Sequence, residues 1–131
     1  MCKAIGQYDK LRLILEDKQQ IIALIEFSFA ITREDEDVFN DYDIQLDEET
    51  DCRFGPTVLD AYQNQGIGSL MFPYVREIAK AFGKRRIILW GGVFWNNETA
   101  IAYYKKQGFL VVGSSLDSKG EEMLDMILDL G

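Results

Sequence analysis

The sequence predicts an α/β fold: a mixed, mostly antiparallel central sheet with flanking helices. Two observations indicate this fold class. Both ends of the chain carry paired runs of alternating apolar residues, which are typical of hairpins, and the middle alternates strand patterns with two helix patterns. With 131 residues, of which 47% are hydrophobic, the chain has room for one core, and we expect residues 1–131 to form a single domain.

The first predicted elements are the two strands of a hairpin. Leu11, Leu13 and Leu15 occupy alternate positions, and after the polar residues 17–20 a second alternation runs over residues 21–31. Two alternating runs joined by a short polar segment predict antiparallel strands, each with one apolar face.

Residues 33–51 are strongly acidic, with an apolar pair at Val38 and Phe39. We interpret them as an extended loop that carries a small strand at residues 42–46. Two interpretations of the charge stay open, because an acidic run either forms a solvated surface or creates a field that attracts amines toward a cleft.

A strand at residues 57–59 is predicted to lead through a glycine loop into a helix from about Ile67 to Phe82. The helix ends at Gly83, which suits a left-handed cap. Its apolar side is predicted to carry Ile67, Leu70, Met71, Tyr74, Val75, Ile78 and Phe82. Pro73 lacks a backbone donor and is expected to bend the first turns.

The rest of the chain predicts a buried strand, a second helix and a final hairpin. Residues 87–90 are apolar throughout, as in a strand at the centre of a sheet. Asn97 caps a predicted helix over residues 98–107. Residues 109–113 and 123–128 are predicted strands joined by a turn-rich segment.

Composition excludes several function classes. The chain has no histidine, which removes Ser-His-Asp and Cys-His catalysis and leaves proton transfer to carboxylates, tyrosine, lysine, backbone or water. Its two cysteines, Cys2 and Cys52, are too few for a disulfide framework or a thiolate zinc site. The net charge of -8 disfavours nucleic acid and anionic membranes and favours a cationic partner. Without a long apolar run or a secretory signal, we expect a cytoplasmic protein that binds no metal.

Residues 63–69, at the predicted junction of strand and helix, carry the main binding motif. Their sequence is Gln63, Asn64, Gln65, Gly66, Ile67, Gly68 and Ser69. At a strand-to-helix junction the first helical N–H groups lack partners, and glycines let a phosphate approach the main chain. The third glycine of a dinucleotide fingerprint and the lysine of a Walker loop are both missing. The loop is therefore a phosphate cradle of another kind, or a pair of glycines that only starts the helix tightly.

A second motif follows the loop in a fixed order. Gln63-x-x-Gly66-x-Gly68 is followed downstream by Asn97, Ala100, Tyr104 and Gly108-Phe109. On these residues the chain resembles the GCN5-related N-acetyltransferase (GNAT) family over residues 58–113.

The resemblance implies that acetyl-coenzyme A (acetyl-CoA) is the acetyl donor. Its pyrophosphate would lie on the backbone of residues 63–69, and its pantetheine arm would lie like an extra strand beside Val58 and Leu59. Asn97 would contact the arm from the other side, so that two splayed strands hold the cofactor. This is chemically sensible, because pantetheine offers two amides to a strand edge and its anionic end meets a helix start.

The resemblance also gives Tyr104 the role of general acid for the departing thiolate. A tyrosine with a pKa of about 10 keeps its proton at neutral pH and can donate it to sulfur. Without the family context, Tyr104 would be a core aromatic residue with its hydroxyl in a cleft. Leu59, or a neighbour at a strand bulge, is expected to offer a backbone N–H to the acetyl carbonyl.

The general base stays open. Some family members carry a glutamate on the strand before the glycine loop, but this chain has none between Cys52 and Leu59. Asp51, Glu49 and Glu26 are the candidates, and each is also an ordinary surface carboxylate.

One departure from the family pattern concerns the acceptor side. Family members place a strand and two helices before the hairpin, and these helices shape the acceptor pocket, whereas ten residues precede Leu11 here. Three explanations remain open: the acidic residues 33–51 replace that wall, a partner subunit of a homodimer does so, or the chain is a degenerate binder of coenzyme A.

Two functions are therefore in competition. The first is acetyl transfer from acetyl-CoA to a primary, cationic amine by direct attack in a ternary complex, because no histidine can activate Cys2 or Cys52 as an acyl carrier. The second is a non-catalytic acyl-CoA-binding or regulatory interaction module of the same fold. The shortened region before the hairpin and the missing base favour the second function, and Tyr104 opposes it.

Overall fold

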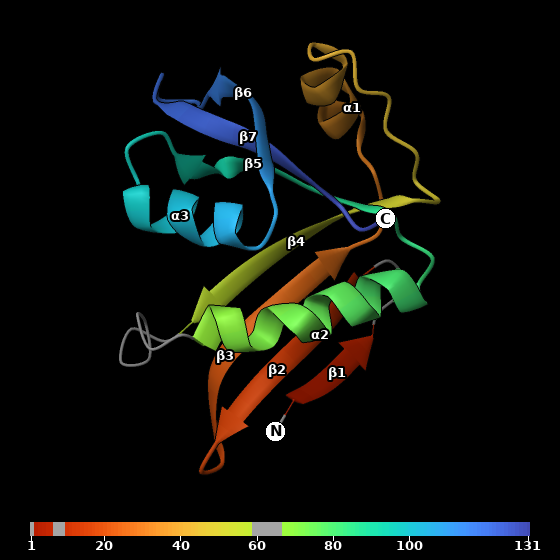
Figure 1. Cartoon of the computed structure of the whole chain (residues 1–131), viewed down its shortest axis with the longest axis vertical. Coiled ribbons are helices and arrows are strands. Elements are labelled where there is room, and N and C mark those ends of the chain that lie inside the picture. The colour runs from red at the N-terminus through yellow and green to blue at the C-terminus, as the bar shows by residue number, and fades with distance from the viewer. Residues whose placement is uncertain (1, 7–9, 59–66) are drawn as a thin grey trace.

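The computed structural model describes residues 2–6, 10–58 and 67–131, whose strands form one sheet in the order β1-β2-β3-β4-β5-β7-β6 (Figure 1). The strands are β1 (Cys2–Gly6), β2 (Lys10–Asp17), β3 (Gln20–Ser28), β4 (Asp51–Val58), β5 (Arg86–Phe94), β6 (Leu110–Leu116) and β7 (Glu122–Asp129). β4 and β5 are parallel neighbours, and the other neighbouring pairs of described strands are antiparallel. The sheet is mixed and mostly antiparallel, so the predicted fold class is confirmed.

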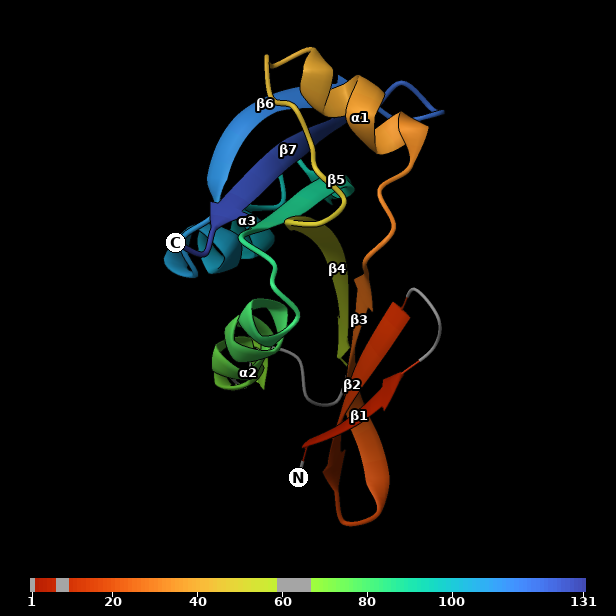
Figure 2. The same ribbon diagram turned by 90° about the vertical axis from the view of Figure 1, so that its right-hand side faces the viewer.

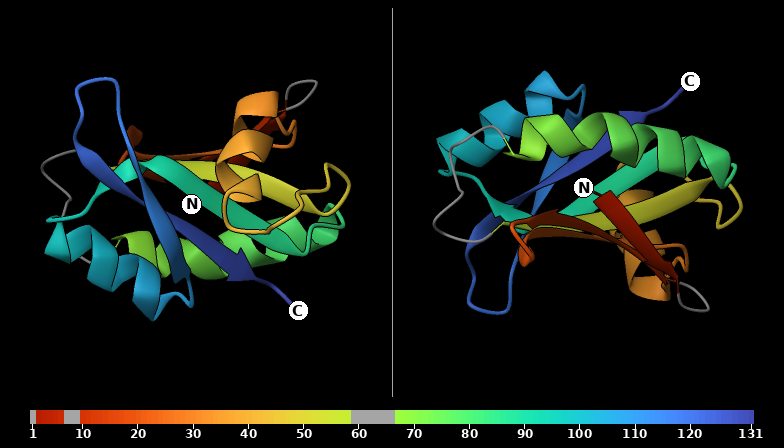
Figure 3. Two further views of the ribbon diagram at one scale, coloured as in Figure 1. Left: turned by 90° about the horizontal axis from the view of Figure 1, so that it is seen from above. Right: turned by 90° about the horizontal axis from the view of Figure 1, so that it is seen from below.

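The helices cover the two faces of the sheet unequally. They are α1 (Arg33–Asn40), α2 (Ile67–Ala81) and α3 (Glu98–Lys106). Figure 3 shows α2 and α3 on one face and α1 on the other. In Figure 2, α1 and the β6–β7 hairpin lie at one end of the molecule, and β1 and β2 reach the other end. The bounds of α2 and α3 agree closely with the predicted ranges, and the glycines after them, Gly83 and Gly108, have positive φ of 78° and 104°.

The beginning of the chain holds a strand that the sequence prediction missed. β1 pairs with β2, with Cys2 opposite Leu15 and Gly6 opposite Leu11. β1 ends at Gly6 and β2 begins at Lys10, so no helix fits between them. The expected shortening of the region before the hairpin is therefore confirmed, although the first strand is retained.

The prediction for the acidic segment was wrong. Its first part forms α1, and the described residues 42–46 form turn and coil in place of the expected strand. Thr32 and Asp35 form a capping box, in which each side chain accepts a hydrogen bond from the other residue's backbone N–H. Negative side chains in the first turn also suit the positive end of a helix dipole. These effects explain why an acidic run becomes helical here.

The apolar side of α2 is rotated relative to the prediction. Met71, Phe72, Val75 and Ala79 are buried, whereas three residues expected on that side are largely exposed. The exposed fractions are 61% for Leu70, 48% for Tyr74 and 54% for Phe82. The difference arises because Phe72 and Ala79 turn inward, and sequence spacing alone gave them no priority over Leu70 and Phe82.

The two faces of the sheet have different chemistry. On the α2 and α3 face, Cys52, Ile87, Met126 and Leu128 are buried in one apolar cluster together with the inward side of α2. On the α1 face, Phe39 and Ile88 are fully buried, and three carboxylates of Asp35, Asp51 and Asp125 are fully buried as well. The main apolar core therefore lies under α2 and α3, and α1 docks on a largely polar surface.

Asp125 shows how this polar docking works. The Tyr42 hydroxyl donates to Asp125 Oδ2 at 2.5 Å, and Ser115 Oγ lies 3.1 Å from Asp125 Oδ1. Burial raises the pKa of Asp125, while the hydrogen bonds from Tyr42 and Ser115 oppose that shift. Burial and the same carboxylate also raise the pKa of Tyr42. The Tyr42 ring lies directly over Gly113 on β6, where a side chain would have no room.

We expect Gly113→Ala to destabilise the fold, because the new Cβ would lie 2.6 Å from Cζ of Tyr42 and even closer to another ring atom. Overpacking of this kind costs about 1–3 kcal/mol. Urea unfolding measures it, with Ser114→Ala as the control: the Ser114 side chain is exposed, and its change should stay within about 0.5 kcal/mol. Equal stability of both variants and the parent would show that Tyr42 does not pack there.

Candidate active site

The central strands β4 and β5 pair only at their beginnings. The described partners are Asp51 with Arg86, Cys52 with Ile87 and Arg53 with Ile88. β4 continues to Val58 beside β3, and β5 continues to Phe94 beside β7, so the two strands part after Arg53 (Figure 1). At about 3.4 Å per residue, residues 54–58 give β4 roughly 17 Å of edge without a described β5 partner.

An irregularity in β5 gives a physical reason for the separation. The ladder between β5 and β7 passes from Leu89 opposite Met126 to Val93 opposite Leu124, so extra residues of β5 lie between these pairs. Gly91 within this bulge has φ of 72°, a conformation that glycine adopts without steric cost. Bulges bend and twist the strand that carries them, which leads β5 away from β4.

The described residues include only part of the predicted cofactor site. Leu59, Gln63, Asn64, Gln65 and Gly66 lie outside the described residues. The remaining residues of the predicted set stand at its two ends: Val58 ends β4, and Ile67, Gly68 and Ser69 begin α2. A strand therefore ends before the glycine motif and a helix begins at Ile67, as predicted.

The start of α2 is tied to the end of α3. Gln107 Nε2 donates to Ser69 Oγ at 3.4 Å, and Arg76 donates to the carbonyl of Gln107. The Arg76 guanidinium also lies over the Phe72 ring, 5.4 Å from its centroid. These contacts hold two elements of the predicted site, the α2 start and α3, at a fixed spacing.

Asn97 caps α3 as predicted. Its side-chain oxygen accepts a hydrogen bond from the backbone N–H of Ala100 at 3.1 Å. It follows the end of β5, where Phe94 and Trp95 are 39% and 58% exposed. Asn97 thus lies at the end of one separated strand, and Val58 lies at the end of the other.

Tyr104 lies in a cluster of aromatic rings on the α2 and α3 face. Its ring centroid is 5.1 Å from that of Tyr103 and 5.4 Å from that of Phe109, with edge-to-face geometry. Tyr104 is 8% exposed, and burial raises the pKa of its hydroxyl. A tyrosine is protonated at neutral pH even without a shift, and burial extends this protonation to higher pH.

The three carboxylates considered as general bases have different settings. Asp51 is fully buried and receives two hydrogen bonds of 2.7 Å from Arg86. Glu49 is exposed in the turn before β4. Glu26 is half-buried on β3, in register with Gly55 on the separated part of β4, and it accepts from Arg12 at 2.8 Å. Of the three, Glu26 lies beside the separated segment.

Cys52 lacks the accessible, ionised thiol that an acyl carrier needs. Its side chain is fully buried in the apolar core, and burial raises the pKa of the thiol to about 12. The thiolate is the reactive form of cysteine, so this side chain is neither ionised nor accessible at neutral pH.

The sequence analysis missed a group of residues where β4 and β5 part. Asp35 of α1 accepts from Trp90 Nε1 at 2.5 Å and lies 3.4 Å from Nη1 of Arg53. The available signal was the charge of Arg53 between the apolar residues Cys52 and Phe54. Asp35 could not be recognised, because the helix that carries it was not predicted.

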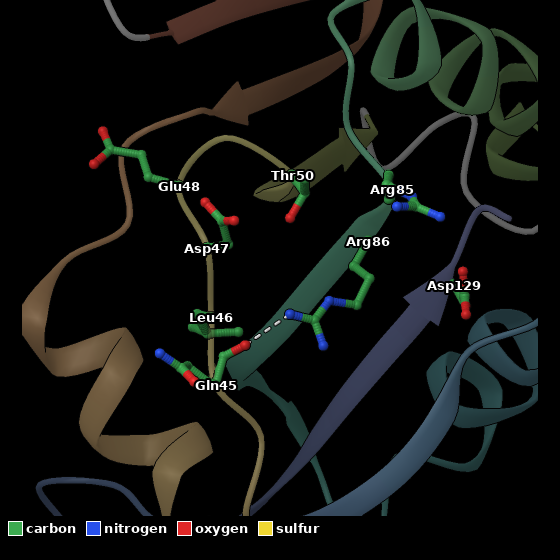
Figure 4. Close-up of a pocket in the computed structure, with 8 residues that line it drawn as sticks. All are labelled: Gln45, Leu46, Asp47, Glu48, Thr50, Arg85, Arg86 and Asp129. Atoms are coloured by element: carbon green, nitrogen blue, oxygen red, sulfur yellow. Dashed lines mark hydrogen bonds between the residues drawn. The ribbon is translucent and has the colours of Figure 1, made fainter.

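A surface pocket of about 770 Å³ lies at the beginning of β4 and β5 (Figure 4). Its lining residues are Gln45, Leu46, Asp47, Glu48, Thr50, Arg85, Arg86 and Asp129. Arg86 Nη2 donates to the Gln45 carbonyl across it at 2.8 Å. From Asp51 to Val58, β4 extends roughly 24 Å at about 3.4 Å per residue, so the pocket is far from the end of β4 at Val58.

Neither a metal centre nor a membrane span is found in the part of the chain that the structure describes. No three histidine, cysteine or carboxylate side chains there are grouped in a way that could hold a metal ion. None of the described helices has the length and apolar character needed to cross a bilayer.

Comparison with known proteins identifies the class. Residues 5–109 match the acetyltransferase (GNAT) family. A GNAT acetyltransferase from Streptococcus pneumoniae superposes with a TM-score of 0.70 at 23% identity, covering 94% of this chain and 68% of that one. A spermidine N-acetyltransferase chimera from Vibrio cholerae gives 0.70 at 16% identity, with 93% and 68% covered. The ribosomal-protein alanine N-acetyltransferase of Escherichia coli gives 0.69 at 17% identity, with 96% and 72% covered.

The chain therefore belongs to the GNAT family of N-acetyltransferases. The resemblance that the sequence showed is confirmed, and acetyl transfer is the chemistry of this class. Acetyl-CoA is the donor that the family generally uses.

We expect Asp51→Asn to lower stability by about 3–5 kcal/mol, since it leaves Arg86 partly buried without its charged partner. The matched variant Glu49→Gln should change stability by no more than about 0.5 kcal/mol, because its side chain is exposed. Urea unfolding and turnover are measured on both. A stable Asp51→Asn protein that has lost turnover would instead assign Asp51 to the chemistry.

Proposed function

We propose that this protein transfers an acetyl group from acetyl-CoA to a primary amine, by direct attack of the amine in a ternary complex. The observation that carries the proposal is the separation of β4 from β5 beside the start of α2. A free strand edge next to a helix N-terminus offers partners for both the amides and the diphosphate of one extended ligand.

The described residues fit this cofactor. Residues 54–58 would hold the pantetheine arm, the amides at the start of α2 with residues 63–66 would hold the pyrophosphate, and Asn97 would approach from the β5 side. Bound acetyl-CoA supplies an activated thioester, whose acyl carbon accepts the amine nitrogen while the thiolate leaves. The chain's own task is to orient these groups and to move two protons.

Tyr104 is proposed to donate a proton to the thiolate. Burial favours its neutral form, and it lies on α3, which is tied to the start of α2 through Gln107 and Ser69. The buried, neutral Cys52 supports direct transfer, because a covalent acyl-cysteine step would need an accessible thiolate.

The acceptor is proposed to reach the site from the α1 face. α1 and the following loop place acidic side chains on that side, which supports an amine that is protonated in solution. It also supports the explanation in which residues 33–51 replace the helices that precede the hairpin in other family members. One molecule of the chain then supplies a wall of the acceptor site, and a homodimer is not needed for that purpose.

A non-catalytic acyl-CoA-binding or regulatory module is the alternative. The burial of Asp51 in an ion pair favours it, because this removes one of the candidate bases from contact with a substrate. Tyr104 opposes it, because a module that only binds has no need of a buried proton donor.

We expect acetyl-CoA or coenzyme A to raise the melting temperature by several degrees, because a ligand at 100 times its Kd stabilises the folded state by about 2.7 kcal/mol. Gly66→Val should abolish the shift by blocking phosphate approach to the main chain. Differential scanning fluorimetry measures both, and a valine variant that keeps the full shift would place the pyrophosphate elsewhere.

We expect Tyr104→Phe to slow turnover by about 100-fold, within the usual range for general acid catalysis, and to leave cofactor affinity nearly unchanged. Tyr103→Phe is the matched control, and it should keep turnover within a few-fold. Thiol release with an amine acceptor measures turnover, and unchanged turnover in Tyr104→Phe would remove its role as the acid.

The pH profile provides a second readout. Because the folded pKa of Tyr104 is raised, its proton is held throughout the range below its ordinary value of about 10. The stabilisation from the neutral form is complete below that pH and is lost as pH rises through the folded pKa. Turnover should therefore show no alkaline decline from Tyr104 below about pH 10.

A further inference from the structure

Three arginines on strands of the α1 face are paired to different degrees. Arg86 meets Asp51 with two bonds of 2.7 Å, and Arg12 meets Glu26 at 2.8 Å. Arg53 has only longer contacts: Nη1 lies 3.4 Å from Asp35, and Nη2 donates to Ser28 Oγ at 3.4 Å. Its Nε is buried and has no hydrogen-bond partner in the described part of the chain.

Asp35 has other, closer partners. It accepts from the backbone N–H of Thr32 at 2.8 Å and from Trp90 Nε1 at 2.5 Å. The contact between Arg53 and Asp35, at 3.4 Å, is therefore longer and weaker than the two bonds of 2.7 Å between Arg86 and Asp51. A guanidinium has five N–H donors arranged as a fork that matches a carboxylate, and Arg53 has donors left for a ligand.

Arg53 lies at the point where an acceptor would meet the acetyl group of the cofactor in the proposed binding mode. It is the last β4 residue with a described partner on β5, so it stands where the two strands begin to part. An arm that enters beside Val58 and follows β4 backward would bring its thioester end toward this point. The Arg53 side chain is 35% exposed, so a ligand can reach it.

We propose that the acceptor carries a carboxylate beside its amine, as a small amino acid does, and that Arg53 binds this carboxylate. This inference rests on the proposed function, because it names the substrate class of the same site. Arg53 orients the acceptor so that its nitrogen faces the acetyl group. The ammonium group first loses one proton to the site or to water. The amine nitrogen then forms a bond to the acetyl carbon while the carbon–sulfur bond breaks, and the thiolate leaves with a proton from Tyr104. A second proton, lost from the same nitrogen as the amide forms, restores the proton of Tyr104.

The surrounding charges narrow the class further. Glu26 lies on the same face, opposite Gly55, which is two residues from Arg53 along β4. Although Glu26 is paired with Arg12 at 2.8 Å, it adds negative charge near the site of the ammonium group. The first turn of α1 carries Glu34 and Glu36, which oppose ligands with several negative charges. A zwitterion with one carboxylate satisfies both conditions, whereas a polyamine leaves Arg53 facing a positive charge.

The direct test uses the unmodified protein. Thiol release from acetyl-CoA is measured with the standard amino acids, with the amide of each, and with spermidine and cadaverine. At least one amino acid should exceed its amide in kcat/KM by about 10- to 100-fold, the range for a hydrogen-bonded charge pair. Calorimetry in saturating coenzyme A should show that amino acid binding more tightly than its amide.

Variants assign the effect to Arg53. Arg53→Gln should remove the preference by lowering kcat/KM for the amino acid and leaving that for the amide nearly unchanged, and Arg53→Lys should retain part of the preference. Arg85→Gln is the matched control, because it removes an exposed arginine that directly precedes β5 and lies outside the proposed site. Thermal melts confirm folding in each case.

The outcomes separate the two levels of the proposal. If no amine releases thiol, the proposed function fails. If amines are acetylated but amides, spermidine or cadaverine match or exceed every amino acid, the proposed function stands and the carboxylate-bearing acceptor is overturned. Retention of the full preference in Arg53→Gln would overturn the role of Arg53.

Discussion

The site depends on one constraint: backbone N–H and C=O groups along one edge of β4 have no partner strand among the described residues. Residues 54–58 of β4 pair with β3 on one side, and on the other side β5 has moved away through the bulge around Gly91. Backbone N–H and C=O groups inside a sheet need partners. Pro56 is compatible with this stretch, because its missing N–H removes no bond to β5. The helix that follows adds further N–H groups without internal partners at its first turn. An extended ligand with amides and a diphosphate satisfies both demands.

The two faces of the sheet have different roles: one forms the apolar core, and the other positions α1. The α2 and α3 face is a closely packed apolar core, which contributes most of the hydrophobic stabilisation and buries Cys52 beyond chemical use. The α1 face buries three carboxylates, and buried charges are weak sources of stability because desolvation offsets their attraction. Each carboxylate instead binds a group from another part of the fold. Asp35 binds Trp90 on β5, Asp51 binds Arg86 on β5, and Asp125 binds Tyr42 after α1. Their effect is to place α1 and its loop at one position on the sheet.

This division also separates the proposed steps of catalysis. Tyr104 holds its proton in the aromatic cluster on one face, whereas Arg53 and Glu26 stand on the other face, beside the strands that part. The proposed proton donor for the leaving thiolate and the charged groups proposed for the acceptor thus lie on opposite faces of the sheet. This arrangement would keep the proposed general acid away from the acceptor's ammonium group.

The sequence by itself determined the fold class, the bounds of α2 and α3, the strand and helix on either side of the glycine motif, and the family. These features depend on local periodicity, capping residues and motif spacing, which act over a few neighbouring residues. It did not determine β1, α1, the rotated apolar side of α2 or the Arg53 cluster. In the sequence, Asp35 is one more acid in an acidic run, and only tertiary structure brings it against Trp90 and Arg53. The physical reason is that burial and pairing of charged groups depend on residues far apart in the chain, which no local pattern encodes.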